Sequence, residues 1–158
     1  KRNVVFHIVG FGILQETYEM LIKQYNIQNH VILHGKMYGI ELERLYNQMD
    51  IGVCTLTFFR DAPKMISSEL KSREYAAKGL PMISGGPIDI FYRQPYKFAL
   101  ELGDDESLID ISRIVEFYDN VYSQNRKEVI TEIREYAYRR CSMDISIRPV
   151  VDYFKSIS

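Results

Sequence analysis

The chain has little cysteine, no excess of charge of one sign and no long apolar run. Its two cysteines, Cys54 and Cys141, have no Cys or His at ligand spacing, which excludes a disulfide framework, a zinc knuckle and an iron–sulfur cluster. Its 20 Lys+Arg nearly balance its 21 Asp+Glu, which argues against a dedicated nucleic-acid binder. No run approaches the roughly 20 apolar residues of a membrane span. Free cysteines are usually buried, so we expect both thiols to be buried and reduced. Since the start also lacks a signal-peptide pattern, we expect a cytoplasmic location.

Length and composition fit one globular domain. The 158 residues are 46% hydrophobic and 26% charged, enough to build a core without disulfides or metals. The first predicted strand begins at residue 3. We therefore predict a single domain, 1–158, that is a fragment of a larger protein.

Short apolar segments alternate with amphipathic ones. Strands are predicted at 3–9, 31–34, 50–56, 80–84 and 97–102. Helical stripes lie between them, including 40–49 and 67–78, and the chain after residue 104 is helical in pattern, ending in a helix at 150–157 with Pro149 at its first turn. The first strand is expected to be buried on both faces. This alternation predicts an α/β fold with a Rossmann-like open parallel sheet flanked by helices.

Ligands of such sheets bind beyond the carboxyl ends of the strands. These ends carry Gly10–Gly12, Gly35, the loop 57–66 and Gly85–Gly86. Gly10-Phe11-Gly12 resembles the opening of a dinucleotide fingerprint, but Gln15 stands where its third glycine would be. A tight turn is as good an interpretation of this loop as a phosphate or sugar contact.

The three histidines offer no motif. His30 and His34 lie four apart, which on a strand is about 13 Å and too far for a shared metal. No G-x-S-x-G nucleophile elbow occurs. Structural or solvated roles for the histidines are therefore favoured.

The helix predicted at 67–78 is the most informative segment. Its N-terminus, capped by Ser67 or Ser68, offers unpaired N–H groups and a partial positive charge that suit a diphosphate. Lys71 and Glu74 lie three apart on one face, where a cation could meet phosphate and a carboxylate could accept from ribose hydroxyls. The alternative is a surface ion pair worth about 0.3–0.5 kcal/mol. Gly79 is expected to end the helix.

This segment, K-S-R-E-Y-A-A-K-G-L-P from Lys71 to Pro81, resembles the K-x-x-E-Y-x-A-x-G-x-P variant of the donor-binding segment of GT-B retaining glycosyltransferases, of the group 1 type. Four further motifs resemble the same family in the same order. They are I-V-G-F-G ending at Gly12, V-I-L-H-G ending at Gly35, the segment from Glu41 to Val53, and the turn from Gly85 to Ile90.

The resemblance implies a C-terminal, donor-binding half of a GT-B fold that lacks its first βα unit. Glu74 matches the glutamate that holds the ribose hydroxyls, and the backbone at Ser67 and Ser68 matches the amides that meet the diphosphate. Lys71 follows the variant, near the donor phosphates. The candidate donor-binding residues also include Leu70, Gly10, Gly12 and Gly35.

This sequence departs from the family at two places. Ile66 stands where the family has the acid that orients the donor sugar, and Glu69 is a tentative substitute. The family's G-R-x-x-x-x-K-G segment, whose Arg and Lys clamp the diphosphate, would lie before Lys1. The acceptor-binding N-terminal domain would lie there too, so no catalytic residue is assigned and the fragment alone is expected to be inactive.

The resemblance predicts the partners of the full-length enzyme. It would transfer a sugar from a nucleotide-diphosphate donor to a hydroxyl acceptor, in polysaccharide, lipopolysaccharide or glycolipid biosynthesis, with no metal and no other cofactor. It would bind no nucleic acid and could lie at the cytoplasmic face of a membrane.

Two alternatives belong to other classes. The chain could be the dinucleotide-binding domain of an oxidoreductase, against which Gln15 and the lack of a ribose-binding acid after the second strand both count. It could also be a non-catalytic α/β interaction module such as a receiver, although the first and third strands do not end in the acids that a receiver needs.

Overall fold

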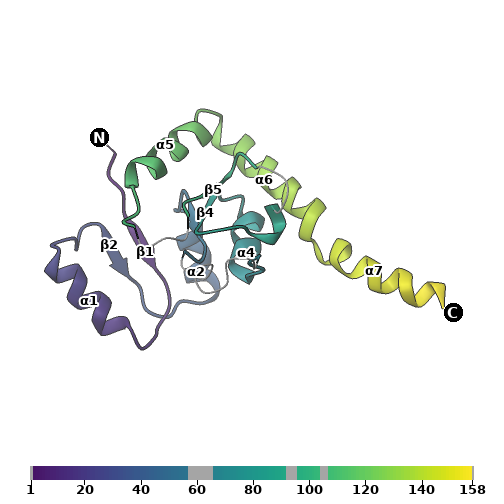
Figure 1. Cartoon of the computed structure of the whole chain (residues 1–158), viewed down its shortest axis with the longest axis horizontal. Coiled ribbons are helices and arrows are strands. Elements are labelled where there is room, and N and C mark those ends of the chain that lie inside the picture. The colour runs from purple at the N-terminus through teal and green to yellow at the C-terminus, as the bar shows by residue number, and fades with distance from the viewer. Residues whose placement is uncertain (1, 57–65, 92–95, 104–106, 158) are drawn as a thin grey trace. The chain divides into compact units, whose positions relative to one another are not determined.

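A computed structural model describes residues 2–56, 66–91, 96–103 and 107–157. Figure 1 traces the chain, which divides into two compact units, Lys1–Gln48 and Met49–Ser158. Both units alternate parallel strands with helices, so the α/β class predicted from the sequence is confirmed.

The first unit contains a two-stranded parallel sheet and two helices. Strand β1 (Phe6–Ile8) pairs with β2 (Val31–Leu33) in the register Phe6↔Val31, and helices α1 (Gln15–Gln24) and α2 (Gly39–Tyr46) follow the strands. The prediction that the first strand is buried on both faces is wrong, because Phe6 is 42% exposed. No described residue in 2–48 is fully buried, since two strands and two short helices cover little apolar surface.

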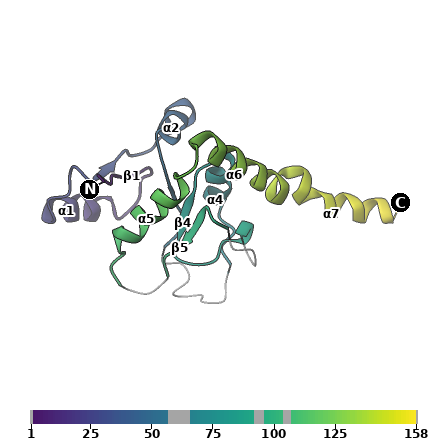
Figure 2. The ribbon, with the colours of Figure 1, turned by 90° about the horizontal axis from the view of Figure 1, so that it is seen from above.

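The second unit holds the core of the molecule. Its parallel sheet has the order β3 (Gly52–Val53), β4 (Met82–Ser84), β5 (Ala99–Glu101), and these are the last three of the predicted strands. Between β3 and β4 lies helix α4 (Leu70–Lys78), and η1 (Asp89–Phe91) follows β4. Helices α5 (Ile111–Val121), α6 (Arg126–Cys141) and α7 (Met143–Ser156) complete the unit. Figure 2 shows α4 and α6 side by side.

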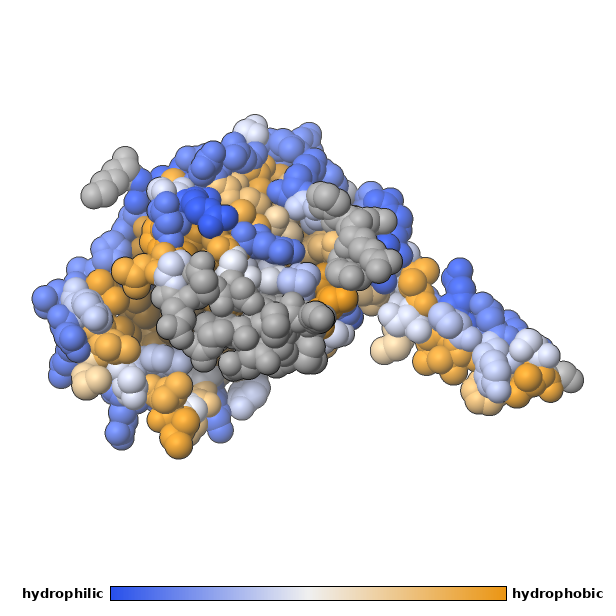
Figure 3. All heavy atoms as spheres, in the orientation of Figure 1, coloured by the Kyte–Doolittle hydropathy of each residue, from blue (hydrophilic) through white to orange (hydrophobic). Residues whose placement is uncertain are grey.

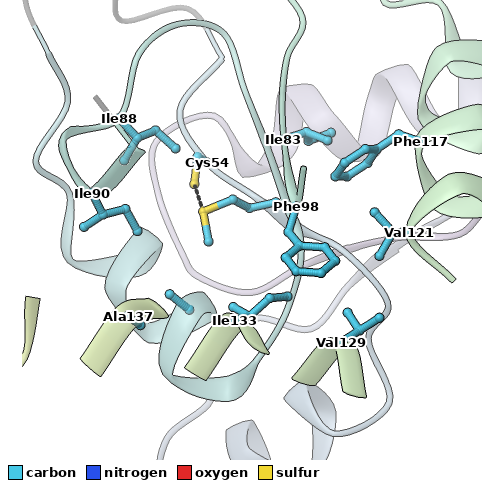
Figure 4. Close-up of a cluster of buried hydrophobic side chains, with 12 residues drawn as sticks. Cys54, Ile83, Ile88, Ile90, Phe98, Phe117, Val121, Val129, Ile133 and Ala137 are labelled. Atoms are coloured by element: carbon cyan, nitrogen blue, oxygen red, sulfur yellow. Dashed lines mark hydrogen bonds between the residues drawn. The ribbon is translucent and has the colours of Figure 1, made fainter. Parts of the chain in front are cut away.

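The core lies between the three-stranded sheet and helices α4, α5 and α6. Phe98, Val129 and Ile133 are almost fully buried, and Figure 4 shows Ile133 and Val129 from α6 pointing toward Phe98. Beside them the Cys54 thiol contacts the sulfur of Met82 at 3.9 Å. Burial raises the pKa of Cys54 to about 12, so this thiol stays protonated and structural, as the sequence predicts.

Helix α7 extends beyond its predicted bounds. It begins at Met143 and continues through Pro149, which the sequence analysis places at a first turn. Ser142 starts the helix earlier because its side chain accepts from the Ile145 amide at 3.4 Å. None of its residues is buried, and its apolar side chains form an orange strip in Figure 3. Across the described part of the chain, no helix is both long and apolar enough to cross a membrane.

Candidate functional site

Helix α4 begins three residues later than the sequence predicts. The expected cap was Ser67 or Ser68, but the N-cap is Glu69, with extended backbone angles of φ −78° and ψ 143°. The amides of the first turn, beginning at Leu70, are the orphan donors that every helix start offers. The predicted end is confirmed, because Gly79 closes α4 with a left-handed φ of 76°.

Ser67 belongs to a strand-like bridge rather than to the helix. Its amide donates to the carbonyl of Pro87 at 3.0 Å, and its carbonyl accepts from the Asp89 amide at 2.8 Å. Ser67 is also buried. This long-range pairing overrides the local capping preference of serine, and it uses the Ser67 amide that was expected to meet a diphosphate.

Ser68 is joined to Asp89 and Arg73. The Ser68 hydroxyl donates to Oδ2 of Asp89 at 2.8 Å, and Arg73 forms an ion pair with the same oxygen. Arg73 also donates to the Glu69 carbonyl at 3.4 Å. The other carboxylate oxygen of Asp89 is buried without a partner among the described residues. The network ties the start of α4 to η1.

Glu69 makes the closest polar contacts at the helix start. Its Oε1 accepts from the Thr55 amide at 3.1 Å, and its Oε2 accepts from the Thr55 hydroxyl at 2.7 Å. Lys71 Nζ lies 3.4 Å from Oε2. Although burial acts to raise the pKa of Glu69, the two Thr55 hydrogen bonds and the Lys71 charge hold it below its usual value. The Glu69 carboxylate is therefore ionised and is bound by Thr55 and Lys71.

Lys71 and Glu74 both lie on α4, as predicted. The Lys71 side chain is 39% exposed, and its ion pair is with Glu69. Glu74 lies at the exposed surface of the helix. Leu70, the first helical residue, is 70% exposed, so its surroundings are open. Hence Ser67, Ser68, Glu69, Leu70 and Lys71 lie at or just before the start of α4, and Glu74 lies in the middle of the same helix.

The predicted glycines Gly10, Gly12 and Gly35 belong to the first unit. The Gly10 amide donates to the Gly35 carbonyl at 2.8 Å, which joins the chain just beyond β1 to the chain just beyond β2. Both residues have positive φ, 141° at Gly10 and 68° at Gly35, which favours glycine. Lys36 Nζ lies 5.5 Å from the centre of the Phe11 ring beside this turn.

Gly85 brings the backbone after β4 against the backbone after β3. A Cβ on Gly85 would lie 1.9 Å from the carbonyl oxygen of Leu56, so a larger residue does not fit there. The Gly85 amide also donates to the Thr55 carbonyl at 3.1 Å. The carboxyl ends of β3 and β4 thus meet at Thr55 and Gly85. Most of the loop predicted at 57–66 lies outside the described residues.

The structure brings together two histidines that no sequence motif pairs. His7 Nδ1 and His34 Nε2 lie 2.9 Å apart, so the rings share a hydrogen bond. Burial first, and the charge of His34 second, lower the pKa of His7. The parallel register His7↔Ile32 places His34 two residues beyond the partner of His7, and this strand alignment was the signal that could have found the pair.

A separate cavity of about 630 Å³ lies beside α6 and contains no predicted site residue. Its lining includes Arg73 and Ala77 of α4 and Arg134, Tyr138 and Arg139 of α6. Arg134 Nε donates to the Ala77 carbonyl at 3.0 Å, near the end of α4. This is a helix-terminus contact that stabilises α4.

Comparison with known proteins shows the fold. No protein-family model matches the chain, and no curated protein matches it. Among solved structures, the chain is similar to the pneumococcal O-GlcNAc transferase GtfA in complex with UDP and GlcNAc, with a TM-score of 0.53 and 15% sequence identity. The match covers 97% of this chain and 28% of GtfA, so the chain spans less than a third of that protein. The chain therefore has the α/β fold of part of a GT-B glycosyltransferase.

Proposed function

We propose that the chain is the nucleotide-sugar-binding part of a glycosyltransferase. The observation that carries the proposal is the first half of α4, where the helix N-terminus, Lys71 and, three residues later, Glu74 occur in a fold shared with an enzyme whose structure contains UDP and GlcNAc. Such a group of a helix N-terminus, a cation and an exposed carboxylate suits a diphosphate and a ribose.

Each residue has a role in this proposal. The amides from Leu70 onward and the Lys71 ammonium would bind the diphosphate, and Glu74 would accept hydrogen bonds from the ribose hydroxyls. The diphosphate gains negative charge as it leaves the sugar, so the positive end of α4 and Lys71 would stabilise it during transfer. Glu69 is already engaged by Thr55 and Lys71, which disfavours it as a sugar ligand.

The finer parts of the proposal concern the whole enzyme. We propose a retaining enzyme of the group 1 type that transfers a sugar to a hydroxyl acceptor in polysaccharide, lipopolysaccharide or glycolipid biosynthesis, without a metal. It would act in the cytoplasm or at the cytoplasmic face of a membrane. These parts rest on the sequence motifs from Lys71 to Pro81 and from Gly85 to Ile90.

The test compares nucleotides by calorimetry and by NMR titration of the 158-residue chain. UDP, GDP, ADP and NAD are titrated side by side, with uridine as the control that lacks phosphate. Binding of one nucleoside diphosphate in preference to NAD supports the proposal, and the preferred base identifies the nucleotide of the sugar donor. Preference for NAD favours the oxidoreductase alternative, and binding of none of them contradicts a nucleotide site. A dissociation constant nearer millimolar than micromolar is expected, because a few helix-end interactions supply only about 4 kcal/mol.

A further inference from the structure

The Glu69 side chain does not cap its own helix. It stands at the N-cap of α4, yet no amide of α4 donates to its side chain. Both carboxylate oxygens instead accept from Thr55, one from the amide and one from the hydroxyl, across 14 residues of sequence. With a side chain 16% exposed, Glu69 is held in one orientation by this two-point contact.

Thr55 is itself fixed at the carboxyl edge of the sheet. The preceding residue, Cys54, donates its amide to the carbonyl of Ile83, and the carbonyl of Thr55 accepts from Gly85 at 3.1 Å. Both contacts join the end of β3 to the end of β4. The Thr55–Glu69 contact therefore connects the start of α4 to the edge where two strands end.

Glu69 also contacts the first turn of α4, through its backbone carbonyl and through its carboxylate. The Glu69 carbonyl accepts from the Ser72 hydroxyl at 2.7 Å, and the Glu69 carboxylate holds Lys71 Nζ at 3.4 Å. A second attachment, Arg73 to Asp89, joins the helix to η1. The first turn of α4, with Lys71, thus lies between two attachment points, the Thr55–Glu69 contact before it and the Arg73–Asp89 ion pair after it.

We infer that Glu69 is a positioning residue, which acts through Thr55 and Lys71 to hold the phosphate-binding turn of α4 at the carboxyl edge of β3. This inference rests on the proposed function, since it concerns the same nucleotide site. It differs from the sugar contact expected for Glu69 from the sequence, because a positioning residue acts on the diphosphate and leaves the sugar untouched.

The experiment changes Thr55, which lies outside α4 and contacts the helix through Glu69. Thr55→Val removes the hydroxyl donor with little change in volume, whereas Thr55→Ser keeps it. We expect Thr55→Val to weaken UDP binding about tenfold, equivalent to about 1.4 kcal/mol, and Thr55→Ser to retain the wild-type affinity. Uridine affinity should be the same in all three proteins, because the nucleoside does not reach the positioned amides.

Further variants separate positioning from general stability. Asp110→Asn is the matched control, since Asp110 is an N-cap carboxylate of α5 in the same unit and accepts from the Ser112 amide at 2.9 Å. It should leave UDP binding unchanged. Glu69→Gln should weaken UDP and UDP-sugar binding equally, and the double variant Thr55→Val/Glu69→Gln should lose less than the sum of the two single losses, because both changes weaken the same Thr55–Glu69 contact.

Each outcome decides one claim. Wild-type affinity for UDP in Thr55→Val overturns the positioning role while leaving the proposed function intact. A Glu69→Gln variant that binds UDP normally but binds UDP-sugars more weakly shows that Glu69 contacts the sugar, and also overturns positioning. Equal losses in Thr55→Val and Asp110→Asn point to general destabilisation and overturn it too. If the wild-type chain binds no nucleoside diphosphate, the proposed function fails and this inference fails with it.

Discussion

The ring of Tyr75 in α4 lies directly against the backbone of Gly52 in β3. A Cβ built on Gly52 would come within 2.4 Å of the Tyr75 ring, so no larger residue fits while the ring stays in place. The Tyr75 hydroxyl also donates to the Val53 carbonyl at 3.2 Å. The residue after Glu74 therefore fixes the distance between the helix of the candidate site and its sheet.

Gly52→Ala should destabilise the protein by about 1–3 kcal/mol, the usual cost of overpacking a well-packed contact. The added methyl must displace the Tyr75 ring or the strand. Urea unfolding of both proteins measures the loss. Gly12→Ala is the control, because a Cβ there meets nothing within 4 Å and should change stability little. Equal stabilities of Gly52→Ala and wild type would contradict the close packing of Tyr75 against Gly52.

The limits of α4 show which features the sequence alone could predict. Its end was predicted correctly because Gly79 combines a local signal, glycine before proline at position 81, with the left-handed φ that this signal indicates. The reason that no side chain fits is not local, since a Cβ on Gly79 would lie 2.7 Å from Ile130 in α6. Local backbone preferences are encoded nearby, whereas packing partners depend on the finished fold.

Its start was predicted wrongly for the same physical reason. Serine favours an N-cap, and the sequence offered Ser67 and Ser68. In the structure, Ser67 forms a β-bridge with Ile88, which lies far along the chain, and Glu69 is the N-cap. The engagement of Glu69 by Thr55 was equally invisible, because it depends on where β3 ends relative to α4. The role of Glu74 in binding a ribose stays a prediction.

The Glu69 contact makes stability depend on pH in the acid range. Because the folded-state pKa of Glu69 is lowered, its ionised form stabilises the protein above the ordinary value of about 4.3, and this contribution is lost as pH falls through the folded-state pKa. The difference in unfolding free energy between wild type and Glu69→Gln should therefore shrink as pH falls from 6 toward 3, as urea unfolding at several pH values can measure. A difference that stays constant over this range would contradict an ionised Glu69 held by Thr55.

His7 should titrate below its ordinary value of about 6.5. Burial and the nearby His34 charge both disfavour protonated His7, so protonation should cost stability as pH falls below that value. NMR titration of the imidazole signals gives the pKa directly. His34→Gln should raise the pKa of His7 by removing the neighbouring charge, and His30→Gln serves as the control because the His30 ring contacts the Val4 carbonyl instead. An unchanged His7 pKa in His34→Gln would show that the two rings are not coupled.

Glu74→Gln tests the ribose contact without altering the shape of the helix surface. If the carboxylate accepts from both ribose hydroxyls, the variant should lose about 1.5–3 kcal/mol of UDP binding, the range for hydrogen bonds to a charged group. Wild type should also bind UDP more tightly than 2′-deoxy-UDP, and this preference should disappear in the variant because the carboxylate that accepts from the 2′-hydroxyl is gone.

NMR titration suits these weak affinities. Glu135→Gln is the matched control, an exposed glutamate of α6 whose partner is Arg139 at 3.8 Å, and it should bind both nucleotides like wild type. Equal UDP affinity in wild type and Glu74→Gln would remove Glu74 from the site, and a retained preference for ribose in the variant would assign that preference to another residue.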